Sequence, residues 1–543
     1  MVEKIPSWIE KLVLDNLSIE GIEIFKQAGF EVDVKPPQKP EELAQIIGNY
    51  DGLVVRSATK VTKEALINAK NLKVVGRAGA GTDNIDKDFA TQMGIVVMNT
   101  PGGNTISACE HTFALILALC RNLPSAHNSM MEGKWDRKKY MGVELRGKTL
   151  GIIGVGRIGG AVAKRALSFE MKVIAHDPIL TPLKAEALGV KLVSLEELFQ
   201  ESDFISIHTP KTEKTNNMIR LEQLKQMKPN CRIVNCARGG IVNEEDLATA
   251  LREKIIAGAA LDVFTSEPPV NNPFLGLDNV ILTPHLAAST EEAQVVVAVD
   301  IAKQMVDFLT TGAIVNAVNV PSIDTETRKS LQPLIDLGER LGMFQSLYTK
   351  GRPISLQIEY AGEIGVTDTY PITSAILTGF LKPLVETVNM ISAPVQIKER
   401  GIECNERKTA RPSSYAFEIS LRVETDQETH TVTGTLFHKT DARICSIDGM
   451  RVDAKPEGYM LVCRNEDKPL VIGRLCTRIG EAGVNIANLM LGRDIKGGLA
   501  LTVLNLDQPL SDEVIQDCAK LPHIIEARLL SLPDNNTDTN NNQ

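Results

Sequence analysis

The chain has 543 residues, of which 43% are hydrophobic and 23% are charged, and its formal net charge is -9. These values are typical of a globular protein with about three or four domains, and the negative charge argues against non-specific nucleic-acid binding. The nine cysteines lack the spacing of a disulfide framework or a zinc site, and the longest apolar run, Phe113–Cys120, is too short to cross a bilayer. The N-terminus is too polar for a secretory signal. We therefore expect a cytoplasmic protein with no metal and no membrane partner.

In residues 1 to about 100, predicted strands alternate with predicted helices, as in a small α/β domain. Strands are predicted at Lys11–Asp15, Glu31–Val34, Leu53–Val55 and Lys73–Gly76, with helices at Glu20–Ala28 and Glu41–Ile47. Arg56 with Ser57, and Arg77 with the glycine turn Gly79–Gly81, follow two of these strands directly. Doubly wound sheets bind ligands at such strand ends. An anion site and simple pairing with carboxylates both remain open for the two arginines.

The stretch Thr149–Pro178 predicts a strand, a glycine-rich turn, a helix and a second strand, which is followed by an acidic residue. Gly154 permits the tight turn, Gly156 lets backbone N–H groups approach a pyrophosphate, and Gly159 lets the helix pack close to the strand. The phosphates would lie at the positive end of that helix. Asp177, about 20 residues on, is placed to bind an adenosine ribose, which favours NAD over NADP. An ordinary βαβ unit with a glycine turn is the alternative.

The segments around this stretch predict a larger parallel sheet. Ser107–Glu110 resembles a capping box that opens an apolar helix through Leu119. Gly133–Tyr140 is polar and basic, as in a solvated loop or an arm that reaches a second subunit. Later strands are predicted at Phe204–His208, Arg232–Cys236, Gly258–Phe264 and Val280–Thr283, whose apolar runs are typical of a sheet covered on both faces. The helix predicted at Thr290–Leu309 is expected to return to the first domain.

The C-terminal third predicts two further domains. Residues 321–455 favour a separate α+β domain, with helices at Leu331–Leu347 and Ala375–Val385 and strands at Ile354–Tyr360, Tyr415–Val423 and Thr429–Phe437. The elements after it follow the order βαββαβ of a ferredoxin-like sandwich, at Tyr459–Arg464, Pro469–Ala482, Asn485–Leu491, Gly498–Leu506, Ser511–Ala519 and Ile524–Leu530. The edges of such a sheet can pair with another subunit. Pro533–Gln543 is a polar, low-complexity tail that we expect to be disordered.

Three residues of complementary chemistry follow predicted strand ends. Oxidation of an alcohol next to a carboxylate needs a cation for the carboxylate, a base for the hydroxyl proton and a group that holds the base. Arg238 has the planar fork that grips a carboxylate, and His285 suits proton exchange near neutral pH. Glu267 could hydrogen-bond the far imidazole nitrogen of that histidine. We therefore predict these three as the catalytic residues.

Several motifs together resemble the NAD-dependent D-2-hydroxyacid dehydrogenase family. They are the glycine motif Gly154–Gly159 with Asp177, and the runs Asn235–Leu247, Ala260–Pro269 and Thr283–Thr290. The runs Leu53–Leu66 and Val75–Asp86 narrow the resemblance to a long-form branch with an intervening domain and a C-terminal ACT domain. The family implies an α/β fold, with a Rossmann-type nucleotide-binding domain inserted in a flavodoxin-like substrate domain. The α+β intervening domain and the ferredoxin-like ACT domain would follow these two.

The resemblance also implies domain limits and an activity. The substrate-binding domain would comprise residues 1–100 and 288–320, the NAD-binding domain 101–287, the intervening domain 321–455 and the ACT-like regulatory domain 457–532, with a tail at 533–543. The branch oxidises 3-phospho-D-glycerate with NAD to 3-phosphohydroxypyruvate, the first step of L-serine biosynthesis. Members are homo-oligomers, and a tetramer and a dimer are both open here.

The family pattern assigns roles residue by residue. Arg238 would clamp the substrate carboxylate, His285 would be the acid/base and Glu267 would orient it. Cofactor contacts are implied at Ala80, Gly154, Gly156, Arg157, Ile158, Gly159, Asp177, Thr209, Cys236, Ala237, Arg238, Asp262, His285, Leu286, Ala287 and Ala288. Substrate contacts are implied at Arg56, Ser57, Arg77, Asn104, Arg238 and His285, with Arg137 supplied by the neighbouring subunit.

Two other functions and one regulatory question remain open. A glyoxylate or hydroxypyruvate reductase would need no phosphate clamp, and a non-enzymatic NAD-sensing corepressor would share the fold. In the ACT-like domain, Gly483–Ala487 matches the family and makes Asn485 a possible serine contact. The turn Asp467–Leu470 ends in leucine where the family has a glycine that lets the backbone approach the ligand. This departure argues against serine as an effector.

Overall fold

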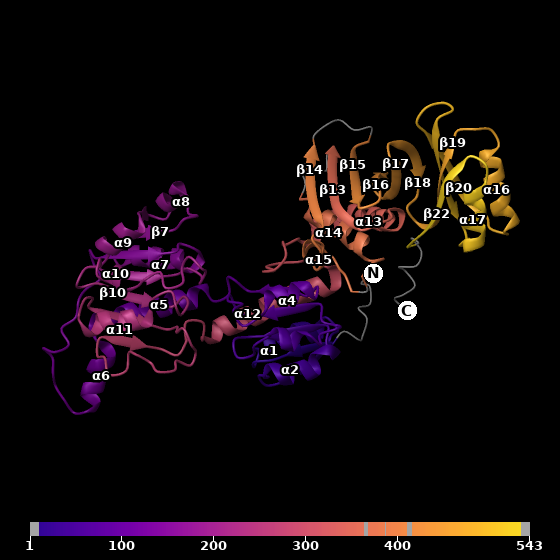
Figure 1. Ribbon diagram of the computed structural model, residues 1–543. Helices are drawn as coiled ribbons and strands as arrows, with labels where there is room; N and C mark the ends of the chain where they lie inside the picture. The colour runs from indigo at the N-terminus through magenta and orange to yellow at the C-terminus, as the bar shows by residue number, and fades with distance from the viewer. Residues whose placement is uncertain (1–9, 363–367, 386, 410–414, 534–543) are drawn as a thin grey trace.

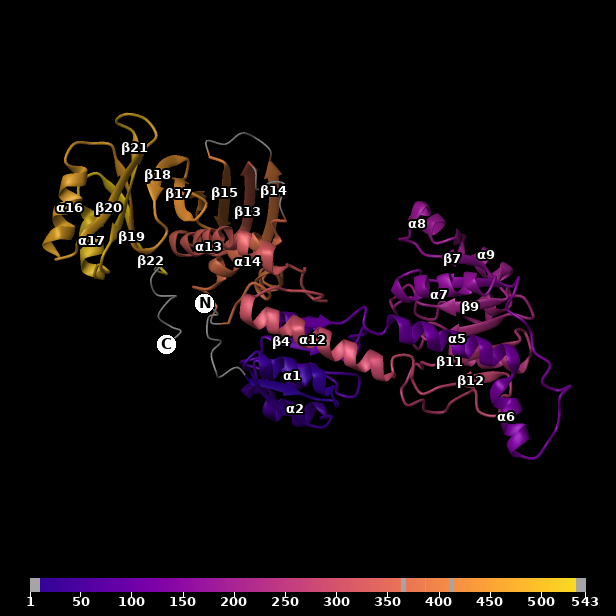
Figure 2. The ribbon, with the colours of Figure 1, turned by 180° about the vertical axis from the view of Figure 1, so that it is seen from behind.

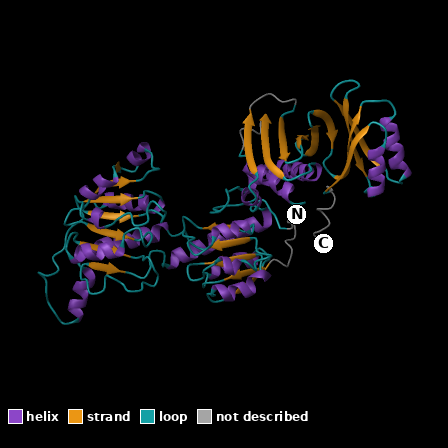
Figure 3. Cartoon of the chain, in the orientation of Figure 1, coloured by secondary structure: helices purple, strands orange, loops and turns teal. Residues whose placement is uncertain are grey.

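The structure, a computed structural model, describes residues 10–362, 368–385, 387–409 and 415–533. Four sheets follow one another along the chain, and the sheet nearest the N-terminus lies between the second and the third (Figures 1 and 3). Of the predicted tail Pro533–Gln543, all but Pro533 lies outside the described residues. Within the described ranges, no helix is long and apolar enough to cross a membrane.

The first sheet has five parallel strands in the flavodoxin-like order β2-β1-β3-β4-β5. Its elements are β1 (Glu10–Val13), α1 (Ile19–Gln27), β2 (Glu31–Val34), α2 (Pro40–Ile46), η1 (Ile47–Asn49), β3 (Gly52–Val55), α3 (Lys63–Leu66), β4 (Val74–Arg77), α4 (Lys87–Gln92) and β5 (Val96–Asn99). The long helix α12 (Glu291–Thr311) returns to this sheet and packs on α1 and β4. A Cβ at Gly21 of α1 would lie 2.7 Å from the carbonyl oxygen of Ala298, so only glycine permits this crossing.

The second sheet has seven parallel strands in the Rossmann order β12-β11-β10-β9-β6-β7-β8. The strands are β6 (Thr149–Ile153), β7 (Lys172–His176), β8 (Lys191–Leu192), β9 (Phe204–Ile207), β10 (Arg232–Asn235), β11 (Gly258–Leu261) and β12 (Val280–Leu282). The helices are α5 (Thr105–Arg121), α6 (Leu123–Met131), α7 (Arg157–Ser168), α8 (Pro182–Ala187), α9 (Leu195–Glu201), α10 (Leu221–Leu224) and α11 (Glu244–Arg252). The strand order reverses between β6 and β9, which is where such sheets bind dinucleotides.

The capping box predicted at Ser107–Glu110 is wrong. Helix α5 begins at Thr105, after the N-cap residue Asn104, so Ser107 lies inside the first turn. The Ser107 hydroxyl instead donates a 2.7 Å hydrogen bond to the carbonyl oxygen of Ala287. A serine followed three residues later by a glutamate can start a helix or lie inside one, and the sequence alone does not distinguish the two.

The third sheet is a mixed, six-stranded layer in the order β14-β13-β15-β16-β17-β18. Its elements are α13 (Thr325–Tyr348), β13 (Pro353–Gly362), α14 (Tyr370–Leu381), α15 (Ala393–Glu399), β14 (Glu403–Thr409), β15 (Phe417–Thr425), β16 (Thr429–Phe437), β17 (Asp441–Ile447) and β18 (Met450–Ala454). Helix α14 begins five residues before the predicted Ala375 and ends before Pro383. Pro371 favours this start because proline fits the first turn of a helix, and Pro383 disfavours a continuation.

The fourth sheet has the order β20-β21-β19-β22, which is that of a ferredoxin-like βαββαβ sandwich. It comprises β19 (Gly458–Glu466), α16 (Val471–Glu481), β20 (Ile486–Arg493), β21 (Leu499–Leu506), α17 (Asp512–Lys520) and β22 (Ile524–Leu532). Helices α16 and α17 cover one face (Figure 1). Side chains on the other face, including Met460, Val462 and Leu530, share one apolar core with α13 and the third sheet. The last two sheets are therefore packed as one unit.

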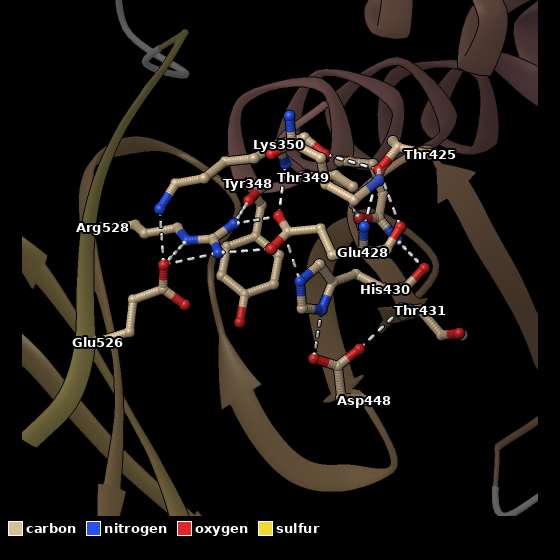
Figure 4. A network of polar contacts seen from close by, with 12 residues as sticks. Tyr348, Thr349, Lys350, Thr425, Glu428, His430, Thr431, Asp448, Glu526 and Arg528 are labelled. Carbon is tan, nitrogen blue, oxygen red and sulfur yellow. Dashed lines mark hydrogen bonds and ion pairs between the residues drawn. The ribbon is translucent and has the colours of Figure 1, made fainter. Parts of the chain in front are cut away.

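An ionic network reinforces this contact (Figure 4). The buried guanidinium of Arg528, on β22, donates to both carboxylate oxygens of Glu428 at 2.7 and 3.0 Å. It also contacts the carboxylate of Glu526 and the carbonyl oxygen of Tyr348 at the end of α13. The hydrogen bonds from Arg528 lower the pKa of Glu428 to about 2. Because this folded pKa lies below the ordinary value of 4.5, the stability gained is complete above pH 4.5 and is lost as the pH falls toward 2.

We predict that Arg528→Met loosens the C-terminal sheet, because it leaves Glu428 and Glu526 without their shared cation. The local cost should be about 2 kcal/mol, and amide hydrogen exchange in β22 should accelerate accordingly. Arg478→Met is the matched control, since Arg478 pairs with Asp517 inside the sandwich at 2.8 Å. Equal exchange in β22 of the two variants would contradict the prediction.

Candidate active site

The candidate site lies at the carboxyl edge of the second sheet. Strands β10, β11 and β12 run parallel and in register, with Asn235 beside Leu261 and Leu261 beside Leu282. The loops that leave these three strand ends carry Arg238, Glu267 and His285 in turn. The topology therefore brings the three predicted catalytic residues to one edge of the sheet.

His285 and Glu267 form a hydrogen-bonded pair. Nδ1 of His285 lies 2.7 Å from Oε2 of Glu267, and Oε1 of Glu267 accepts from the backbone N–H of Phe264 at 3.0 Å. Burial alone would raise the pKa of Glu267, but the hydrogen bonds from His285 and Phe264 outweigh it and lower the pKa. The two side chains remain 45% and 38% exposed. Nε2 of the imidazole is thus the ring nitrogen left to exchange a proton with a ligand.

The loop that carries His285 is held by one buried carboxylate. Asp262 is 0% exposed, and its Oδ1 accepts from the Leu286 N–H at 2.8 Å and from the Thr283 hydroxyl at 2.6 Å. Its Oδ2 accepts from the Ala287 N–H at 2.9 Å, and His111 of α5 lies 3.2 Å from Oδ1. Burial raises the pKa of Asp262, but these hydrogen bonds prevail and lower it. The carboxylate therefore stays ionised and fixes the loop.

Arg238 reaches across to the first sheet. Its Nε donates to Oδ2 of Asp83 at 2.9 Å, and a Cβ at Gly81 would lie 2.1 Å from its Nη2. Asn235 shapes the loop behind it, since its side chain donates to the Arg238 carbonyl at 2.9 Å and accepts from the Ala237 N–H at 3.0 Å. The guanidinium is thus placed over the glycine turn that follows β4.

A second guanidinium lies at the same turn. A Cβ at Gly79 would lie 1.4 Å from Nη1 of Arg77, so only glycine leaves room for this side chain. Nε of Arg77 is buried and has no hydrogen-bond partner among the described residues. Burial, together with the neighbouring charges of Arg238 and Arg56, lowers the pKa of Arg77 to about 10. Guanidiniums this close together favour an anionic ligand.

The glycine motif has the geometry of a dinucleotide cradle. Gly154 has φ +90°, and a Cβ at Gly159 would lie 2.0 Å from the carbonyl oxygen of Gly154. A Cβ at Gly156 would meet nothing within 4 Å, so the space beside it is free for a pyrophosphate. Asp177 accepts from the backbone N–H groups of Val155, Ile179 and Leu180, which outweigh burial and lower its pKa. These residues fit NAD.

The remaining residues predicted to contact the cofactor or the substrate differ in exposure and in their hydrogen-bond partners. Ser57, Arg157 and Leu286 are exposed, whereas Arg56, Ile158, Thr209, Ala237 and Ala288 are half-buried. The carbonyl of Ala80 accepts from Asn99 at 2.5 Å, and burial raises the pKa of the Cys236 thiol to about 12. Oδ1 of Asn104 is buried without a partner in the described part of the chain. Arg137 is exposed in the loop after α6.

The sequence did not predict the roles of four positioning residues. His111 and Ser107 on α5 support Asp262 and Ala287, and Asp83 pairs with Arg238. Asp15 accepts from the Arg56 N–H at 2.9 Å and so shapes the loop after β3. Only Asp15 carried a usable signal, because it is an acid placed directly after a buried strand.

Comparison with known proteins agrees with this geometry. The family described as "D-isomer specific 2-hydroxyacid dehydrogenase, NAD binding domain" matches residues 113–287, and "D-3-phosphoglycerate dehydrogenase intervening domain" matches residues 330–448. The chain is 43% identical over 525 residues to the D-3-phosphoglycerate dehydrogenase of Archaeoglobus fulgidus, covering 96% of this chain and 99% of that protein. It is 42% identical to the D-3-phosphoglycerate dehydrogenase of Synechocystis, covering 96% and 94% of the two chains.

A solved structure supports the cofactor. The chain is similar to the crystal structure of D-lactate dehydrogenase from Aquifex aeolicus in complex with NAD and lactic acid, with a TM-score of 0.52 and 29% identity. The match covers 57% of this chain and 100% of that one.

Proposed function

The chain belongs to the D-3-phosphoglycerate dehydrogenase family, and from this premise we propose that Arg238, His285 and Glu267 carry out its reaction. The reaction is the oxidation of 3-phospho-D-glycerate by NAD to 3-phosphohydroxypyruvate and NADH, the first step of L-serine biosynthesis. The observation that supports the proposed roles is the hydrogen bond between His285 and Glu267, at the strand edge that also carries Arg238.

Each proposed role follows from the chemistry of the side chain. Glu267 accepts the Nδ1 proton of His285, which leaves the lone pair of Nε2 to take the proton of the substrate hydroxyl. Arg238 holds the carboxylate on the neighbouring carbon, so that the C2 hydrogen has a fixed direction. Gly154, Gly156 and Asp177 would hold NAD, which would supply the acceptor for the hydride of C2. The positive charge gained by His285 is offset by Glu267.

We expect His285→Ala to lower kcat by about a hundredfold or more, because the hydroxyl proton then has no positioned acceptor. Glu267→Gln should also lower kcat, since an amide cannot balance the charge on the imidazole. NADH binding, measured by fluorescence, should stay near that of the parent enzyme in both variants. Near-normal turnover of His285→Ala would refute the proposed roles.

We propose that Arg77 and Arg56 bind the substrate phosphate, with Ser57, Asn104 and the partner-derived Arg137 nearby. The buried, unpartnered Nε of Arg77 supports this assignment, because a phosphate oxygen would satisfy it. Arg77 is repelled by the charges of both Arg238 and Arg56, which favours a ligand with two anionic ends, a carboxylate and a phosphate.

Arg77→Gln should therefore raise KM for 3-phosphohydroxypyruvate by about tenfold or more, since a charge-assisted contact is lost. The same variant should use unphosphorylated hydroxypyruvate about as well as the parent enzyme does. Initial rates of NADH consumption with the two substrates provide the measurement. An equal loss on both substrates would mean that Arg77 supports the fold and does not read the phosphate.

We infer the domain limits given above from the sequence, with residues 1–100 and 288–320 as the substrate-binding domain, 101–287 as the NAD-binding domain, 321–455 as the intervening domain and 457–532 as the ACT-like domain. We also propose a homotetramer or a dimer. Its support is the exposed apolar surface beside Arg137, where Met131, Trp135 and Met141 are 75%, 74% and 81% exposed. The free thiols of all nine cysteines fit a cytoplasmic location.

We propose that serine does not inhibit this enzyme through the ACT-like domain. Leu470 adopts the left-handed conformation, φ +69°, that the family's glycine would adopt easily, and its side chain is 69% exposed beside the turn. Asn485, the other candidate contact, already donates to Asp507 at 2.7 Å. Both features oppose a small zwitterionic ligand at this place.

Millimolar serine should accordingly leave the rate of NADH formation unchanged in the parent enzyme. Leu470→Gly restores the family residue and removes about 1 kcal/mol of backbone strain, so its thermal midpoint should rise. Leu470→Ala, which keeps the Cβ, should not show that rise. Inhibition of the parent enzyme by serine, abolished by Asn485→Ala, would overturn the proposal.

A further inference from the structure

A cavity of about 890 Å³ lies between the first sheet and the third, and none of its lining residues belongs to the candidate active site. The end of α12, the segment Val320–Ile323 and the segment Thr387–Ser392 line it. Phe308, Leu309 and Met390 are among the apolar side chains of its wall. This volume falls within the range of small-molecule sites, about 300–1,000 Å³.

One cation in this wall is half-buried, and the charge that acts on it, Asp336 of the same helix, forms no ion pair with it. Arg328, on the first turn of α13, is half-buried, and no described residue forms a hydrogen bond or an ion pair with its guanidinium. The guanidinium lies against Gly312, where a Cβ would come within 2.5 Å of Nε. Two other charged residues of the wall are paired with each other, since Lys73 contacts Asp51 at 3.1 Å. Arg328 is thus held in place with its donors free.

A second polar group in the same wall is also unpartnered. Ser374 of α14 is 1% exposed, and its hydroxyl finds no hydrogen-bond partner in the described residues. Leaving such a buried hydroxyl unsatisfied costs about 1–3 kcal/mol, and a ligand atom would remove that cost. Within the described residues, the cavity wall therefore combines apolar side chains with a half-buried guanidinium and a buried hydroxyl that have no hydrogen-bond partner.

We propose that this cavity binds a small amphipathic carboxylate. Its anionic end would pair with Arg328 and accept from Ser374, and its apolar body would pack on α12 and on the segment Thr387–Ser392. One half-buried guanidinium and one buried hydroxyl match a monoanion better than a phosphate, which requires more donors. This proposal is independent of the catalytic roles given above.

The position of the cavity gives such a ligand a structural effect. The amide of Asn389 donates to the Gly94 carbonyl at 2.9 Å, and Gln92 donates to Glu399 at 2.6 Å, so two hydrogen bonds already join the sheets beside it. Helix α12 runs from the second sheet along the first (Figure 2), and Phe308 and Leu309 near its C-terminal end line the cavity. A bound carboxylate would add contacts between the first sheet and the third at the end of that helix.

Octanoate is the probe that tests the proposal, by calorimetric titration into the full-length enzyme. We expect one site per chain, and Arg328→Gln should weaken binding about tenfold or more, because the charge-assisted pair is lost. Lys329→Gln is the matched control, since Lys329 is the next residue on the helix and is exposed outside the cavity wall. It should change affinity less than twofold, and octylammonium, with the same chain and the opposite charge, should not bind there.

Two further measurements, the rate of NADH formation and amide hydrogen exchange, complete the test. Both variants should retain the parent rate of NADH formation, which shows that they are folded. Octanoate should slow amide exchange in Phe308–Gly312 and Thr387–Ser392 of the parent enzyme. The proposal fails if octanoate does not bind, if Arg328→Gln and Lys329→Gln bind it equally, or if the protection falls elsewhere.

Discussion

The site depends on one buried charge, the carboxylate of Asp262. It collects hydrogen bonds from Thr283, Leu286 and Ala287, and so determines the path of the backbone on both sides of His285. That path is unfavourable by itself, since His285 has φ +55°, a conformation that non-glycine residues rarely adopt. A buried, ionised acceptor can hold such a loop because any other conformation would leave its charge unsatisfied. The pairing of the imidazole with Glu267 follows from this constraint.

The proposed substrate half of the site combines like-charge repulsion with a single ion pair. Arg77 and Arg238 come from different sheets and lie over the same glycine turn, where side chains at Gly79 or Gly81 would displace them. Asp83 satisfies one donor of Arg238, and Arg77 keeps a buried N–H without a partner. Like charges held this close lower the stability of the free protein and strengthen the binding of a doubly anionic ligand. The glycines are thus as necessary to the anion site as the arginines.

The sequence predicted correctly those elements that depend on residues close together in the chain. Apolar runs predicted the parallel strands, and the Gly154–Gly159 spacing predicted the strand–turn–helix unit, because each depends on neighbours within a few residues. It failed where a residue's partner lies far along the chain. Ser107 looked like a helix cap, yet its partner is the carbonyl of Ala287, and His111 looked like an ordinary member of an apolar helix, yet it contacts Asp262. The face of the C-terminal sheet that joins the core of α13 was hidden for the same reason.

Within the described residues, the chain crosses between the first two sheets twice, before α5 and before α12, and both crossings lie beside the loop of His285. In the first crossing, a Cβ at Gly103 would lie 2.6 Å from Val297 of α12. The hydrogen bond from Ser107 to Ala287 then ties the start of α5 to the second crossing. A change in the angle between the sheets must be absorbed in these two short segments, since α12 is one continuous helix of 21 residues. The loop of His285 therefore lies between the two crossings, so the position of its imidazole depends on the angle between the two sheets.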